Sequence, residues 1–129
     1  MKRIIAVAAF SLLSIGGALA QTPAPAPFER IPLQTTEWPA GYNFTSMVVK
    51  IQPNGVIPRH THPGIESGYV QDGEVVLSVA GKPDATAKAG GSWIVPGDTA
   101  HSAKGGATGA TVIVNYVVDK TKPISAPAP

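Results

Sequence analysis

Apolar and polar residues alternate over short stretches of this chain, in the pattern of β-strands. Residues 42–51 (YNFTSMVVKI) alternate in this way and are rich in β-branched and aromatic side chains, which favour strands. Residues 53–55 (PNG) follow at once, and proline, asparagine and glycine are typical of a turn. The pattern predicts a strand over 42–51 that ends in a turn.

The next two apolar segments predict a hairpin. Residues 67–71 (SGYVQ) and 74–80 (EVVLSVA) flank Asp72-Gly73, a dipeptide that favours a tight turn because glycine tolerates a positive φ. On the second of these strands Val75, Leu77 and Val79 share one face, since side chains alternate along a strand. Glu74, Val76 and Ser78 lie on the other face.

Further strands are predicted at residues 92–96 (SWIVP) and 111–118 (TVIVNYVV), with residues 104–110 (KGGATGA) as a glycine-rich loop before the second. No stretch has the spacing of a long amphipathic helix. Many short strands with Gly/Pro turns indicate an all-β antiparallel sandwich or barrel. We expect a single domain over residues 28–119.

The N-terminus has the layout of a secretory signal peptide. Lys2 and Arg3 precede a small-and-apolar run over residues 4–19, and the sequence ALA|Q places small residues before Gln21. A transmembrane anchor is the alternative, but this run is short for a membrane span of about 20 residues. We expect residues 1–20 to be removed, and the protein to be exported to the periplasm or the medium without a stable membrane anchor.

The chain ends and the charge balance add little chemistry. Residues 21–27 (QTPAPAP) and 120–129 (KTKPISAPAP) are rich in proline and alanine, and we expect a disordered linker and a disordered tail. The formal charge of +2 becomes zero once Lys2 and Arg3 are removed. Without a basic cluster, nucleic acid is not expected as a partner.

The absence of cysteine restricts the chemistry further. The chain contains no cysteine, so an exported protein of this sequence has neither disulfides nor thiolate metal ligands. Any metal must therefore be held by nitrogen and oxygen atoms.

The three histidines of the chain are the main candidates for such ligands. His60 and His62 lie two residues apart, so they project to the same side of a strand. Pro63-Gly64 then allows the chain to bend and bring Glu66 alongside. Two imidazoles and a carboxylate suit a divalent cation, and His101 could complete the set from a neighbouring strand. The alternative, ordinary polar or core histidines, leaves buried imidazoles without partners, which is costly.

Two stretches carry a family resemblance. Residues 55–73 (GVIPRHTHPGIESGYVQDG) resemble the first cupin motif, G-x5-H-x-H-x3–4-E-x6-G, with His60, His62 and Glu66 in the ligand positions. Residues 90–101 (GGSWIVPGDTAH) resemble the second motif, G-x5-P-x-G-x2-H-x3-N, with His101 as its ligand. Three positions depart from the pattern: four residues separate Gly55 from His60, Asp98 replaces a glycine, and Gly105 replaces the final asparagine.

The resemblance implies a cupin-type antiparallel β-barrel, or jelly roll, with one divalent transition metal ion in its mouth. His60, His62, Glu66 and His101 would be the ligands, and Mn²⁺, Fe²⁺, Ni²⁺, Cu²⁺ or Zn²⁺ all suit this donor set. Four protein ligands leave room for water, dioxygen or substrate on the ion. Together with the sheet edges of a small all-β chain, the resemblance also implies a homodimer that pairs edge strands.

Other residues have more ordinary interpretations. Tyr69 and Trp93 are expected to pack, and Tyr69 faces away from Glu66 by strand alternation. Asp98 is either a turn residue or a partner of His101. Arg59 is expected on the outer face. Thr111 and Asn115 share a face, and the pattern leaves open whether it points inward.

Two functions remain open at the level of sequence. If the protein is an enzyme, we expect a metal-dependent dioxygenase acting on a small organic substrate, with Glu66 as ligand and proton acceptor. The alternative is a non-catalytic barrel that binds a small ligand or a metal ion, because the fold alone does not decide function.

Overall fold

The computed structural model describes residues 24–129. The signal peptide expected at residues 1–20, and the start of the linker expected at 21–27, lie outside the described residues. Residues 24–27 are exposed and belong to no strand. No helix in the described part of the chain is long and apolar enough to cross a membrane.

Residues 24–129 contain eight strands and no helix, which confirms the all-β class. The strands are β1 (Phe28–Glu37), β2 (Tyr42–Ile51), β3 (Val56–Thr61), β4 (Gly64–Val79), β5 (Ala85–Lys88), β6 (Ser92–Val95), β7 (His101–Asp119) and β8 (Ala126–Pro127). β2 has the bounds that the sequence predicted, and the turn at residues 53–55 follows it.

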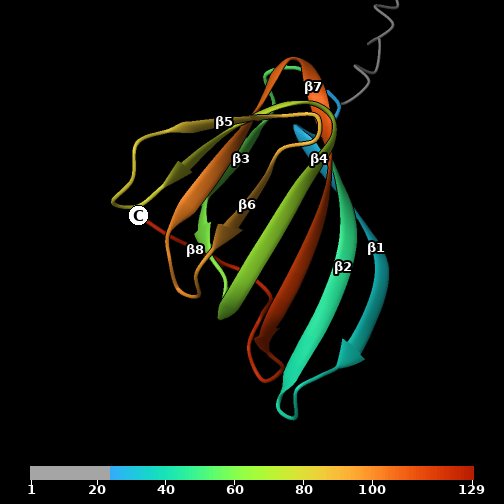
Figure 1. The fold of residues 1–129 in the computed structure, drawn as a ribbon, viewed down its shortest axis with the longest axis vertical. Coiled ribbons are helices and arrows are strands. Elements are labelled where there is room, and N and C mark those ends of the chain that lie inside the picture. Colours follow the sequence, from blue (N-terminus) through green and yellow to red (C-terminus); the bar gives the residue numbers. More distant parts are fainter. Residues whose placement is uncertain (1–23) are drawn as a thin grey trace, which may run out of the picture.

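The two long strands β4 and β7 connect the halves of one antiparallel sheet (Figure 1). The first part of β4 pairs with β6 and with the second part of β7, which continues to β2 and β1. The second part of β4 pairs with β5 and with the first part of β7, which continues to β3 and β8. Because both long strands bend, the two halves face each other as a jelly roll.

The bend in β4 lies at Asp72-Gly73, where the sequence predicted the turn of a hairpin. That prediction was wrong, because β4 runs without interruption from Gly64 to Val79. The pairing with β7 shifts register on both sides of this dipeptide, as at a β-bulge. Gly73 does adopt a positive φ of 77°, but it uses that freedom to bend the strand. A Cβ there would lie 2.2 Å from the Gly109 carbonyl oxygen.

Residues 104–110 were predicted to form a loop, and this prediction was also wrong. They lie inside β7, opposite the bend of β4, where Ala110 pairs with Gly73. Gly109 has a positive φ of 80°, and a Cβ on it would lie 2.5 Å from the Ile51 carbonyl oxygen. The glycines of this stretch therefore allow close backbone contact at the bend instead of forming a loose connection.

The core lies between the two halves of the sheet. Alternate residues of β2, β4 and β7 are buried, as expected for strands with one face inside. Val75 and Leu77 belong to this face, which confirms the predicted alternation. Asn115 and Thr111 are only half-buried and alternate with the buried Val112 and Val114, so their shared face is the outer one.

The C-terminal segment is ordered, in contrast to the disordered tail predicted at residues 120–129. β8 pairs with the end of β3, with Pro127 opposite His60 and Ala126 opposite Thr61. The Ile124 side chain packs against the core. Proline-rich composition indicated a free tail, but pairing with the β3 edge and burial of Ile124 hold the segment in place.

Candidate metal centre

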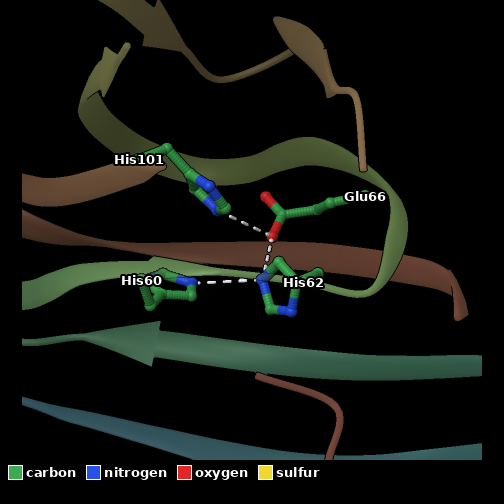
Figure 2. A group of neighbouring side chains, drawn as sticks. All are labelled: His60, His62, Glu66 and His101. Carbon is green, nitrogen blue, oxygen red and sulfur yellow. Dashed lines mark hydrogen bonds and ion pairs between the residues drawn. The ribbon is translucent and has the colours of Figure 1, made fainter. Parts of the chain in front are cut away.

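The structure brings together all four candidate ligands. His60 lies in β3, His62 follows that strand directly, Glu66 lies in β4 and His101 begins β7. One nitrogen or oxygen atom from each lies within 4.8 Å of those of the other three. Figure 2 shows the four side chains pointing toward a common centre. The bend at Pro63-Gly64 turns the chain from β3 into β4 and carries Glu66 to this point, as the sequence predicted.

The Nδ1 atom of each imidazole is held by a backbone carbonyl. His60 Nδ1 lies 2.7 Å from the Pro58 oxygen, and His101 Nδ1 lies 2.9 Å from the Thr99 oxygen. His62 Nδ1 likewise contacts the Ile124 oxygen. Since a carbonyl only accepts, each Nδ1 must donate its proton. In the neutral ring the lone pair is then on Nε2, the atom that faces the common centre.

These Nε2 atoms lie close to one another and to the Glu66 carboxylate. The distances are 3.1 Å between the Nε2 atoms of His60 and His62, 2.9 Å from His62 Nε2 to Glu66 Oε2, and 3.3 Å from His101 Nε2 to the same oxygen (Figure 2). Lone pairs at such distances repel unless a proton or a cation lies between them.

The spacing fits a single metal ion. Donors bound about 2.1 Å from an ion at right angles to each other lie about 3 Å apart, close to the three distances above. Three imidazoles and a carboxylate are also a donor set that divalent transition metals accept. The cluster formed by His60, His62, Glu66 and His101 therefore fits one divalent metal ion.

The electrostatics of the cluster keep Glu66 ionised. Burial by itself would raise the pKa of the Glu66 carboxyl. Without a metal, a second proton on the His101 or His62 ring lies on Nε2 and bonds to Glu66; these bonds outweigh burial, and the pKa of Glu66 lies well below its usual range. Burial by itself would lower the pKa of His101, but the hydrogen bond to Glu66 outweighs burial and the pKa of His101 is raised. The pKa of His60 is lowered, mainly by burial. Glu66 is thus a carboxylate at neutral pH, the form in which it binds a cation.

Trp93 has a role that the sequence did not indicate. Its Nε1–H donates to Glu66 Oε1 over 2.8 Å, while the other carboxylate oxygen, Oε2, faces the histidines. β6 pairs with β4 so that Trp93 lies opposite Gly68, where a Cβ would collide with the indole ring. The prediction that Trp93 only packs was therefore incomplete. Strand register, which no local pattern specifies, brings it to Glu66.

The turn before His101 contains Asp98 in a left-handed backbone conformation. Asp98 adopts a positive φ of 55°, a conformation that suits the glycine of the motif and that aspartate tolerates better than most residues. Its backbone N–H donates to the His62 carbonyl over 2.8 Å. Asp98 is exposed and acts as a turn residue, so the first of the two interpretations from sequence is correct.

Tyr69 is where the sequence placed it, away from Glu66 and exposed on the outer face.

Tyr116 is a further aromatic residue at the site, and sequence did not single it out. It is buried on β7, and its ring centroid lies 4.6 Å from that of His62. Burial, with the nearby charge of Glu66, raises the pKa of Tyr116 well above its usual range, so it is a neutral phenol.

A cavity opens beside the cluster. His60, Glu66 and His101 line it together with Trp93 and Tyr116. Its other walls are mainly apolar and come from β2, β3, β4 and β7, with Arg30 of β1 as a cationic exception. A mainly apolar cavity with a few converging polar groups is typical of a small-molecule site.

Comparison with known proteins supports this assignment of the fold. Structures similar to this chain include an oxalate oxidase in complex with glycolate, at 24% identity and a TM-score of 0.64 over 81% of this chain and 56% of that one. An oxalate decarboxylase variant from Bacillus subtilis matches at 15% identity and a TM-score of 0.68, over 81% of this chain and 29% of that one.

A further similar structure is the DMSP lyase DddQ from Ruegeria pomeroyi, at 19% identity and a TM-score of 0.61, over 66% of this chain and 43% of that one. The chain thus spans about half the length of the lyase and the oxidase. Comparison with curated proteins gives no match. The family model of the cupin domain matches residues 47–117, from β2 through β7 and including all four clustered residues, and the chain therefore belongs to the cupin domain family.

Proposed function

We propose that His60, His62, Glu66 and His101 bind one divalent transition metal ion, and that the adjoining cavity binds a small organic molecule. The observation that carries this proposal is the convergence of three Nε2 atoms and one carboxylate oxygen. All three Nδ1 atoms are occupied by backbone carbonyls, so the rings are oriented with Nε2 available for a metal.

We further propose that the protein is a metal-dependent dioxygenase. A bound transition metal would supply Lewis acidity and a place for dioxygen and substrate oxygens. The chain's own residues bind and orient: the apolar walls limit water, and Trp93 holds Glu66 Oε1 so that Oε2 stays on the metal side. The low pKa of Glu66 suits a ligand better than a base, so its role as proton acceptor is the secondary one.

The alternative is a non-catalytic barrel that binds a small ligand or a metal ion. The named neighbours include an oxidase, a decarboxylase and a lyase, so different reactions occur on this fold and the fold does not choose among them. Elemental analysis of protein purified from its native compartment separates the two functions. Stoichiometric iron, copper, nickel or manganese supports the dioxygenase, whereas zinc alone or no metal supports the binding barrel.

Export is a separate part of the proposal. The charged start, the apolar run and the ALA|Q boundary of the sequence support cleavage between Ala20 and Gln21. N-terminal sequencing of the protein isolated from the producing cells should therefore begin at Gln21. An intact Met1 would contradict export by this route.

A further inference from the structure

Arg30 is a charged residue at the cavity to which neither the metal cluster nor the family motifs assign a role. It lies in β1, opposite Val49 of β2. Val49 is buried in the core, and paired residues of adjacent strands project to the same face of a sheet. Arg30 therefore extends on the barrel side of β1, where its side chain lines the cavity.

The guanidinium of Arg30 is held in place but not neutralised. Its Cζ lies 4.6 Å from the centre of the Phe28 ring, a cation–π contact that orients the side chain. None of the ion pairs found within residues 24–129 includes Arg30. Residues 1–23 contain no aspartate or glutamate. Its donors are thus not taken up by a carboxylate of this chain.

Tyr116 lies close to both Arg30 and the metal cluster. The centroid of the Tyr116 ring lies 4.6 Å from that of the His62 ring. The Arg30 guanidinium acts on the Tyr116 hydroxyl and offsets part of the increase in its pKa that burial causes. Tyr116 is thus close to both His62 and Arg30. The lining of the cavity thus combines one cation, Arg30, with the His–Glu cluster and mainly apolar side chains.

We propose that Arg30 is the anion-binding residue of this cavity, and that the ligand is a small organic acid whose carboxylate pairs with the guanidinium. Arginine presents a planar array of donors that matches a carboxylate. The charge of +2 on a divalent ion at the cluster would exceed the single negative charge of Glu66. The electrostatic potential in the cavity would therefore also favour an anion. This inference rests on the proposed small-molecule site and specifies the class of its ligand.

The test compares dicarboxylates with monocarboxylates. The zinc-loaded protein is titrated with oxalate, malonate and succinate, and with acetate and propionate, by calorimetry. A dicarboxylate of the length that joins the metal to Arg30 should bind roughly tenfold or more tightly than the monocarboxylates. Arg30→Gln, with unchanged zinc content, should lose this advantage. Lys50→Gln, an equal charge change on an exposed residue of β2, should keep it.

Two outcomes overturn the proposal: Arg30→Gln binds the dicarboxylates as tightly as the wild type, or Lys50→Gln weakens them equally. Failure of the metal site is detected separately, by zinc content. In that case the Arg30 Nε–H resonance is followed by NMR in the metal-free protein during a succinate titration. A saturable shift of this resonance with succinate, and none with the same concentration of chloride, supports the anion site without a metal, and no shift rejects it.

Discussion

His62 donates its Nδ1 proton to the backbone carbonyl of Ile124, 62 residues further along the chain. Through this bond the C-terminal segment sets the tautomer of a candidate metal ligand, leaving the Nε2 lone pair toward Glu66. β8 supports the same segment by pairing with the end of β3, and Ala128 N–H donates to the Arg59 carbonyl over 3.1 Å. Residues 120–129, which were expected to form a disordered tail, thus support the metal site.

Loosening the C-terminal segment should therefore weaken metal binding. Ile124→Ala removes its packing against the core, and Ala128→Pro removes the N–H that donates to Arg59. We expect each change to raise the rate of metal release to a chelator by roughly tenfold, the usual scale for partners that orient a ligand. Lys122→Ala, on an exposed residue of the same segment, is the control. Equal release rates in all three variants would contradict a supporting role.

The histidines themselves should be indispensable. His60→Ala, His62→Ala and His101→Ala should each lower metal affinity by more than about 100-fold, beyond the loss typical of supporting residues, because no other histidine can replace them. Metal content after dialysis measures this, with Arg59→Ala as the neighbouring control. Full occupancy in His101→Ala, together with loss in His60→Ala, would reduce the site to three ligands.

Glu66→Gln should weaken metal binding less than the loss of a histidine, because the amide oxygen still coordinates weakly. Any catalytic activity should nevertheless fall sharply, since the amide cannot accept a proton. Metal titration and turnover are measured on the same preparation. Equal losses of affinity in Glu66→Gln and His62→Ala would show that the carboxylate charge is needed for binding itself.

Trp93→Phe tests the support of the carboxylate. The change keeps an aromatic ring beside Gly68 but removes the donor to Glu66 Oε1. We expect the metal-free protein to lose about 1.5–3 kcal/mol of unfolding free energy, the range for a hydrogen bond to a charged group. Denaturant unfolding measures the loss, and Tyr69→Phe on the outer face should change it little. An unaltered unfolding midpoint in Trp93→Phe would show that this bond contributes nothing.

Assembly can be tested at the β1 edge. β1 pairs only with β2 among the described strands, and Leu33 on it is exposed. We predict a homodimer through edge strands, and Leu33→Lys should weaken it by roughly tenfold or more, from the loss of a buried leucine. Light scattering at micromolar concentration reports the mass, with Tyr69→Lys, on the outer face of the internal strand β4, as the control. A wild-type monomer would reject the dimer.

The pH dependence of stability should reveal the contribution of an ion pair between Glu37, at the end of β1, and Lys120, which follows β7. Lys120 Nζ lies 2.7 Å from Glu37 Oε1 and, with the Gly41 N–H, lowers the pKa of the Glu37 carboxyl. A lowered folded-state pKa contributes stability above the unfolded-state pKa, and this is lost as pH falls through the folded-state value. Glu37→Gln should therefore be less stable than the wild type at pH 7 and equal to it under strong acid. A difference that persists in acid would exclude this pair as its source.

The sequence by itself determined the strand class, which side chains of a strand share a face, and the identity of the four clustered residues. These are local features: alternation has a period of two, so Val75 and Leu77 share a face and His60 and His62 point together. The cupin motifs added His101, which lies 41 positions after His60 and pairs with it across β3 and β7.

Only the tertiary structure decided the features that depend on register and on distant segments. The Asp72-Gly73 dipeptide suits a turn and a bulge equally, and pairing with β7 along the whole of β4 selects the bulge. The contacts of Trp93 with Glu66, of Ile124 with His62 and of Arg30 with the cavity each join segments that are far apart in sequence. Local pattern cannot specify such contacts, because they arise only when the barrel closes and brings the strand ends together.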